Sequence, residues 1–167
     1  MSQTNSIVNI IIAGLGGQGV LKASDIVAEA AFRAGHDVKK SEVHGMSQRG
    51  GSVASDVRFG KRVFSPMVPP GQADFLVVLA PDQVDANRAQ LRPEGTLIEP
   101  SAVPESALRN KKSINVASLG VLSRGLDIPE DAWTAGIRAV LPEKLHEVNL
   151  EAFFAGRRSG EDEGHEL

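Results

Sequence analysis

A glycine-rich turn directly after a continuous apolar run constrains this chain more than any other feature of its sequence. Residues 7–13 (Ile-Val-Asn-Ile-Ile-Ile-Ala) form a largely β-branched apolar run, which is typical of a buried parallel strand. Residues 14–19 (Gly-Leu-Gly-Gly-Gln-Gly) have the glycine spacing that permits a tight turn, close approach of a ligand and close helix packing. From Gly17 to Ala34 apolar residues recur at gaps of three and four, and Gly35 is placed to end a helix. The junction therefore predicts a helix N-terminus and free N–H groups where a phosphate could sit.

The remaining periodicities predict one α/β domain, Rossmann-like and doubly wound, with a mostly parallel sheet and an antiparallel β insertion. A charged strand near the sheet edge is expected over 36–42, and an alternating, half-exposed strand over 52–59. A turn at Gly60-Lys61 would lead that strand into a short hairpin at Val63-Phe64. Prolines 66, 69 and 70 then predict a stiff connector.

The second half of the chain predicts the rest of the sheet and its helices. We expect strands at 75–79, 95–99 and 113–116, a helix starting at Pro81, and helices over Asp131–Leu141 and Glu143–Phe154. The domain is expected to span residues 1–156, and residues 157–167 to form a flexible acidic tail.

Composition excludes several kinds of site. The chain has no cysteine, so it can form no disulfide, thiolate nucleophile or cysteine-ligated zinc or iron–sulfur centre. Its four histidines are far apart, and no metal site is expected. No apolar run approaches the ~18 residues that span a bilayer, and the first residues do not resemble a signal peptide, so we expect a cytoplasmic protein.

The segment from Arg33 to Arg62 is locally basic, with seven Lys or Arg against three acids (Asp37, Glu42 and Asp56). It could favour an anionic ligand near the glycine turn, or it could be a solvated face. No basic stripe with interleaved aromatic residues is present, so no nucleic-acid partner is expected.

The glycine turn alone leaves two alternatives open, a nucleotide site and a purely structural turn. Glu42 lies about 20 residues beyond the turn, where a dinucleotide fold places its ribose-binding acid. However, Glu42 opens a dense loop, and the chain is short for a second mononucleotide half together with a substrate site. A stand-alone NAD(P)-binding reductase or nucleotide sensor is therefore an alternative function.

A second motif changes the balance between these alternatives. Residues 42–53 (Glu-Val-His-Gly-Met-Ser-Gln-Arg-Gly-Gly-Ser-Val) place a carboxylate, an imidazole, an amide and a guanidinium beside three glycines. Arg49 offers a planar fork for a carboxylate or phosphate. The alternative is a surface loop in which Glu42 holds Arg49 in a structural ion pair.

The two motifs, together with residues 73–76 (Ala-Asp-Phe-Leu), resemble the gamma-type subunit of the 2-oxoacid:ferredoxin (acceptor) oxidoreductases over about residues 7–154. The His-Gly-Met-Ser-Gln-Arg-Gly-Gly form of the second motif is most similar to the small beta subunit of indolepyruvate:ferredoxin oxidoreductase. The resemblance implies a complex that oxidatively decarboxylates an aryl 2-oxoacid, such as indolepyruvate or phenylglyoxylate, to its acyl-CoA. Thiamine diphosphate, Mg and iron–sulfur clusters would reside on partner subunits, and coenzyme A and ferredoxin or another acceptor would complete the reaction. This chain alone is expected to be inactive and to hold none of these cofactors by itself.

The resemblance also implies site residues. A pyrophosphate, a substrate carboxylate or a partner subunit is expected to contact Gly14, Gly16, Gly17, Gln18, Gly19, Glu42, Gln48, Arg49, Gly50 and Gly51. His44 is a candidate acid or base, with a structural hydrogen bond as the alternative. Whether the glycine turn meets coenzyme A or only a partner subunit stays open at this stage.

Overall fold

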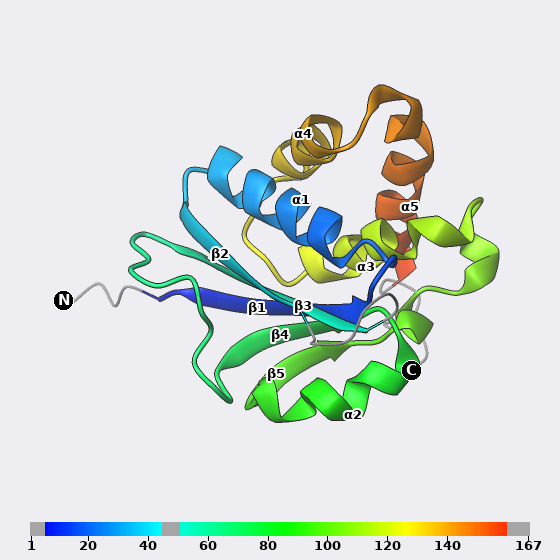
Figure 1. Ribbon diagram of the computed structural model, residues 1–167. Helices are drawn as coiled ribbons and strands as arrows, with labels where there is room; N and C mark the ends of the chain where they lie inside the picture. The colour runs from blue at the N-terminus through cyan, green and yellow to red at the C-terminus, as the bar shows by residue number, and fades with distance from the viewer. Residues whose placement is uncertain (1–5, 45–50, 160–167) are drawn as a thin grey trace, which may run out of the picture.

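The computed structural model describes residues 6–44 and 51–159, and excludes the side chains of Val43 and His44. These residues form one five-stranded sheet in the order β2-β3-β1-β4-β5 (Figure 1). The β1–β4 and β4–β5 pairs are parallel, whereas β3 runs antiparallel to both β1 and β2. Within the described chain, four strands therefore share one direction, and the predicted α/β fold with an antiparallel excursion is confirmed. The strands are β1 (Val8–Leu15), β2 (Asp37–His44), β3 (Ser52–Gly60), β4 (Ala73–Val78) and β5 (Leu91–Ile98).

The helices are distributed unequally over the two faces of the sheet. The longer helices α1, α3, α4 and α5 lie over one face, whereas the short α2 and the turns beside it lie over the other (Figure 1). The helices are α1 (Val20–Arg33), α2 (Val84–Asn87), α3 (Ile114–Ser123), α4 (Glu130–Val140) and α5 (His146–Ser159). Short 3₁₀ turns are η1 (Pro81–Gln83), η2 (Arg88–Gln90), η3 (Pro100–Ala102), η4 (Glu105–Ala107), η5 (Lys111–Ser113) and η6 (Glu143–Leu145).

Apolar residues on both faces of β1 explain its continuous apolar sequence. Ile10 and Ile12 join the large core under the helices, where the rings of Trp133 and Phe153 lie 5.6 Å apart between centroids. Ile11 joins a smaller core on the opposite face, with residues of β4 and of the connector between β3 and β4. A strand buried on both faces has no polar side to alternate with.

Helices α3 and α5 pack closely where each carries a glycine. A Cβ added to Gly156 would lie 1.8 Å from the carbonyl oxygen of Ala117, and one added to Gly120 would lie 2.0 Å from that of Phe153. Backbone atoms of one helix therefore occupy the space that a side chain would need on the other.

Two predicted strands are wrong. Residues 113–116 belong to η5 and α3, because α3 is apolar on nearly all sides and such a run does not distinguish a strand from a buried helix. Val63 and Phe64 form no hairpin strand: the Val63 N–H donates to Asp37 Oδ2 at 2.8 Å, and the Phe64 side chain is exposed. The chain from 61 to 72 is an irregular connector, as its prolines predicted.

The prediction that 52–59 is half-exposed is also wrong for its middle part. β3 lies between β1 and β2, so Ser55, Asp56 and Val57 are all buried. The edge position predicted for the 36–42 strand is confirmed, and so are the helices over 131–141 and 143–154. Helix α5 continues through Arg157 to Ser159, past the expected domain limit at 156. That limit stays a prediction, and residues 160–167 lie outside the described residues.

Candidate functional site

The carboxyl ends of β1 and β4 define the candidate site. β1 continues through α1 toward the β2–β3 side of the sheet, whereas β4 pairs with the opposite side of β1. The strand order therefore reverses between β1 and β4. In open α/β sheets, ligands bind outside the strand ends at this reversal. The glycine turn lies there, between the end of β1 and the start of α1.

The glycines of the turn are required for different reasons. Gly17 and Gly19 have φ angles of +89° and +79°, a backbone conformation that other residues rarely adopt. A Cβ on Gly17 would meet no atom within 4 Å, whereas a Cβ on Gly19 would lie 2.4 Å from Asn115 Nδ2. A Cβ on Gly14 would lie 2.8 Å from Gln18 Oε1. Gly17 thus faces open space, while Gly14 and Gly19 permit close packing beneath the turn.

Gln18 ties the turn to both neighbouring strands. Its Oε1 accepts a hydrogen bond from the Leu15 N–H at 2.7 Å, and its Nε2 donates to the carbonyl oxygen of Leu79 at 3.1 Å. The Leu79 N–H in turn donates to the carbonyl oxygen of Ala13 at 2.9 Å. The Gln18 amide is therefore engaged by backbone of β1 and of the residue after β4. A ligand at this turn would meet backbone N–H groups rather than this side chain.

Asn115 contacts the glycine turn through a hydrogen bond, and the sequence did not predict it as a site residue. It lies at the start of α3, is nine-tenths buried, and donates from Nδ2 to the Gly19 carbonyl oxygen at 3.3 Å. Its only sequence signal is that it is the single amide in the run that forms α3, which is apolar apart from this residue and two serines. Nothing in that run indicates which turn the amide contacts.

The structure joins the second glycine motif to the first. The Gly16 N–H donates to the carbonyl oxygen of Gly51 at 2.9 Å, directly before β3 begins. Ser52 Oγ donates to Gln83 Oε1 at 2.7 Å, which links the same point to η1. β2 and β3 pair as a hairpin up to His44 and Val53, so the motif lies at the carboxyl edge of the sheet. Gln48, Arg49 and Gly50 lie outside the described residues, and of His44 only the backbone is described.

Glu42 is not brought to the glycine turn. It pairs with Ser55 of β3, which pairs with Ile12 of β1, so Glu42 lies two strand spacings, roughly 10 Å, from β1. Its Oε1 accepts from Lys40 Nζ at 2.8 Å, and Lys40 is also paired with Asp25 of α1. Burial alone would lower the pKa of Lys40, but these two carboxylates outweigh it and raise that pKa. Because β3 lies between β1 and β2, Glu42 is too far from the glycine turn to bind the ribose of a dinucleotide there.

A groove of about 460 Å³ lies beside the turn, between α3 and the start of α5. Lys22 and Lys112 lie along it, and neither forms an ion pair with the described part of the chain. Asn115 contributes an amide, while Leu141 and Leu145 belong to an apolar wall. Two ammonium groups near the N-terminus of α1, with no acid among the described lining residues, suit a phosphorylated ligand.

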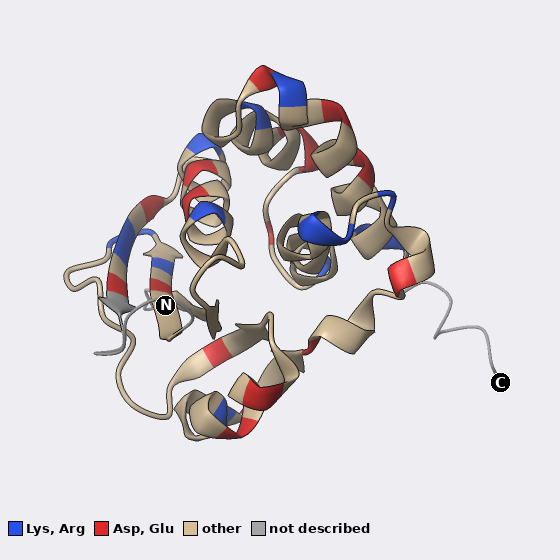
Figure 2. Cartoon of the chain, turned by 45° about the vertical axis from the view of Figure 1, so that its right-hand side comes forward, with Lys and Arg blue, Asp and Glu red and all other residues tan. Residues whose placement is uncertain are grey.

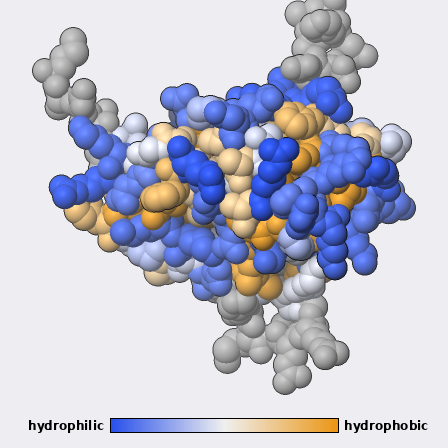
Figure 3. Space-filling view, turned by 90° about the horizontal axis from the view of Figure 1, so that it is seen from above, coloured by the Kyte–Doolittle hydropathy of each residue, from blue (hydrophilic) through white to orange (hydrophobic). Residues whose placement is uncertain are grey.

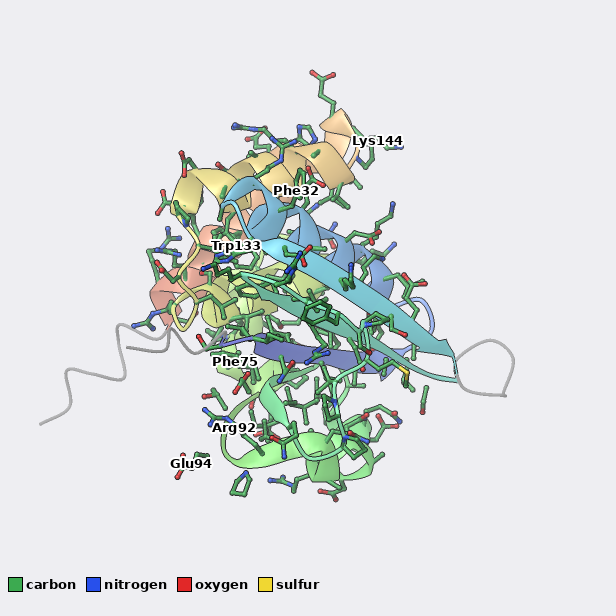
Figure 4. All side chains as sticks on the ribbon, turned by 90° about the vertical axis from the view of Figure 1, so that its left-hand side faces the viewer. Phe32, Phe75, Arg92, Glu94, Trp133 and Lys144 are labelled. Carbon is green, nitrogen blue, oxygen red and sulfur yellow. The ribbon has the colours of Figure 1, made fainter. Side chains whose placement is uncertain are left out.

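Another hollow, of about 520 Å³, lies at the opposite, amino-terminal edge of the sheet. Figure 4 shows Phe75 and Arg92 on that side of the molecule. Arg92 is paired with Asp74 at 2.9 Å, and Asp127 adds a further carboxylate to the lining. Its net negative lining and its distance from the strand carboxyl ends make it a poorer candidate for an anionic ligand.

Comparison with known proteins identifies the family. Residues 9–159 match the pyruvate ferredoxin/flavodoxin oxidoreductase family. The chain belongs to this family. The indolepyruvate oxidoreductase subunit IorB of Thermococcus kodakarensis is 33% identical to it, over 92% of this chain and 96% of that protein.

Solved structures agree with this membership of the pyruvate ferredoxin/flavodoxin oxidoreductase family. The keto/oxoacid ferredoxin oxidoreductase gamma subunit of Geobacter sulfurreducens superposes with a TM-score of 0.78 at 25% identity, covering 93% of this chain and 99% of that one. The 2-oxoglutarate:ferredoxin oxidoreductase of Magnetococcus marinus, solved with 2-oxoglutarate, coenzyme A and succinyl-CoA, has the same fold. Its TM-score is 0.80 at 20% identity, covering 93% of this chain and 31% of that one. The resemblance expected from the two glycine motifs is confirmed.

Two structural absences complete the description of this family member. Among residues 6–44 and 51–159, no three His, Asp or Glu side chains are grouped so that they could hold a metal ion. Over the same residues, no helix combines the length and the apolar character needed to cross a bilayer.

Proposed function

We propose that this chain is the gamma-type subunit of a thiamine diphosphate-dependent 2-oxoacid:ferredoxin (acceptor) oxidoreductase that acts on an aryl 2-oxoacid such as indolepyruvate or phenylglyoxylate. The observation that carries the proposal is the junction of the two glycine motifs, Gly16 with Gly51, at the carboxyl edge of the sheet. The support for an aryl substrate is the match to an indolepyruvate oxidoreductase subunit along nearly its whole length.

The chain's residues do not fit the redox and decarboxylation cofactors of such a complex. It has no cysteine to ligate an iron–sulfur cluster, and no Gly-Asp-Gly sequence for a metal–diphosphate site. Thiamine diphosphate, Mg and the clusters therefore belong to partner subunits in this proposal. The isolated chain is expected to be inactive. The chain is expected to occupy the same cell compartment as its partner subunits.

The chain's residues do fit coenzyme A, which supplies the thiol that accepts the acyl group. Lys22 and Lys112 would hold its phosphates at the groove beside the glycine turn, and the backbone N–H groups of Gly17 and Gly19 would add hydrogen bonds, since those of Gly16 and Gln18 already donate to the carbonyl oxygens of Gly51 and Leu15. Leu141 and Leu145 would exclude water from the apolar part of the ligand. Arg49, three residues before β3 begins at Ser52, is expected to act at the same edge.

The test is a gentle native purification of the tagged chain from its own cells. We expect the eluate to contain partner subunits that carry thiamine diphosphate and iron. We also expect it to oxidise indolepyruvate or phenylglyoxylate in a reaction that depends on coenzyme A. A colourless single chain that carries bound nucleotide would overturn the proposal and favour a stand-alone nucleotide-binding protein.

The assembled complex also tests the second motif. Arg49→Ala should reduce kcat/KM by roughly 10- to 100-fold, the range of a charge-assisted hydrogen bond to a phosphate or carboxylate. Arg33→Ala is the matched control, because Arg33 pairs with Glu29 at the far end of α1. Equal activity of both variants would show that Arg49 has no role in substrate or coenzyme A binding.

A further inference from the structure

The second face of the sheet is covered much less than the helical face. Figure 1 shows only the connector between β3 and β4 and the short stretch around α2 on that side. The apolar cluster there is small, and includes Ile11 of β1 and Leu76 of β4. By contrast, hydrophilic side chains cover much of the surface seen over α1 and α4 (Figure 3). The apolar residues on the second face of the sheet are therefore covered by fewer elements than those on the helical face.

The connector on this face presents two large apolar side chains to solvent. Phe64 is 79% exposed and Met67 is 58% exposed, and they lie three residues apart. Met67 also lines a hollow of about 310 Å³, with Ile11 and Ala54 of the sheet among its lining. Phe64 does not line this hollow, and the Arg62 guanidinium lies 5.7 Å from its ring centroid, so Met67 is the exposed apolar residue at the hollow itself. Exposed apolar surface that continues into an apolar hollow is typical of an interaction site.

A buried carboxylate lies in this hollow. Asp56 is 9% exposed, and its Oδ2 accepts from the Val68 N–H at 2.9 Å. Burial raises the pKa of Asp56, although the Val68 N–H and the positive charge of Arg58 act in the opposite direction. Arg58 does not pair with it: its guanidinium donates to Asn9 Oδ1 and to the Ser65 carbonyl oxygen, both at 2.8 Å. Of the described residues that line the hollow, Asp56 alone carries a charge, so no lining residue supplies a cation.

The stretch beside the hollow is also acidic. Between Pro81 and Glu99 the exposed acids Asp82, Asp85, Glu94 and Glu99 outnumber the two arginines. Both arginines are already paired, Arg88 with Asp85 at 3.8 Å and Arg92 with Asp74 at 2.9 Å. Figure 2 shows several acidic positions on the helical turn and the strand at this end of the sheet. At the hollow, the negative charge of this stretch and of Asp56 therefore favours a positively charged group, whereas Lys61 and Arg62 add positive charge at the Phe64 end of the connector.

We propose that this face docks a partner subunit which inserts a lysine or arginine side chain into the hollow to meet Asp56, and which covers Phe64 and Met67 with apolar residues. The inference rests on the proposed function, since it assigns one surface of the subunit to its complex. A cation that enters the hollow neutralises a carboxylate already removed from water. The apolar rim excludes water from that pair, which is the usual arrangement of an interface hot spot.

The experiment compares three tagged variants in the native complex. Asp56→Asn keeps the acceptor for Val68 and removes the charge, and Met67→Glu adds a repelling charge at the rim. Phe32→Ser is the matched control, because Phe32 is 67% exposed on α1, which lies over the other face. We expect Asp56→Asn and Met67→Glu each to weaken partner binding at least tenfold in a dilution series, and Phe32→Ser to bind like wild type. Hydrogen exchange on assembly should protect residues 56–70 more than residues 20–33.

The outcomes separate this inference from the proposed function. If wild type recovers no thiamine- or iron-containing subunit, the proposed function fails and the inference fails with it. If wild type assembles but Asp56→Asn and Met67→Glu, each folded by circular dichroism, assemble equally well, the inference alone is overturned. Reversible self-association of the purified wild-type chain that Met67→Glu abolishes would also overturn it, since the occupant would then be a second copy.

Discussion

Replacing Gly156 by alanine forces a methyl group into the contact between α3 and α5. The new Cβ would lie 1.8 Å from the carbonyl oxygen of Ala117, whereas ordinary van der Waals contact begins at 3.4 Å, so the atoms must separate by 3.4 − 1.8 = 1.6 Å. Because the obstacle is backbone, it cannot rotate away as a side chain could. Overpacking of this kind costs about 3 kcal/mol, and the better helix propensity of alanine returns about 1 kcal/mol. We therefore expect a loss of about 2 kcal/mol in the free energy of unfolding.

The assay is thermal and urea unfolding followed by circular dichroism. For a domain of this size, 2 kcal/mol corresponds to a fall in Tm of about 4–8 °C. The matched control is Gly136→Ala in α4, whose new Cβ would lie 3.2 Å from the Ala30 nitrogen and needs a shift of only a few tenths of an ångström. We expect that control to remain within about 1 kcal/mol of wild type. Equal stability of the two variants would refute the conclusion that the α3–α5 contact is too rigid to separate.

Two further substitutions test the site and the second face. Gln18→Ala should cost about 1–3 kcal/mol in urea unfolding, because the Leu15 N–H and the Leu79 carbonyl lose their partner; a change below 0.5 kcal/mol (on the order of experimental error) would contradict that role. Asp56→Asn should raise stability at pH 7, because the folded-state pKa of Asp56 lies above its usual value of 3.8 and ionisation therefore opposes folding. Its advantage in thermal melts should shrink as the pH falls toward 3.8 and below, and a pH-independent difference would rule out the charge as the cause.

Local patterns predicted the first strand, the glycine turn and α1, because each depends on residues close in sequence. The position of β3 could not be predicted this way, since its pairing with β1 joins residues more than 35 positions apart. The same insertion displaces Glu42 from β1, so a correct spacing in sequence did not place that carboxylate at the turn.

The candidate site was found as two separate motifs, and only the fold shows that they meet. The hydrogen bond from Gly16 to Gly51 and the contact of Asn115 with Gly19 both depend on long-range packing. The sequence over 113–116 predicts a strand, because apolar residues surround α3 on nearly every side and so hide its helical period.

The fully buried Trp133 gives the protein a single intrinsic optical probe. The chain has one tryptophan and no tyrosine, so its near-ultraviolet fluorescence arises from one indole in the helical layer. Within the described residues, the indole N–H of Trp133 has no hydrogen-bond partner, so its emission should respond strongly to any water that enters. Trp133 packs with Phe153 of α5, away from the second face and its hollow. A shift in its emission on assembly would therefore report rearrangement of the helices, and constant emission would indicate docking of a rigid body.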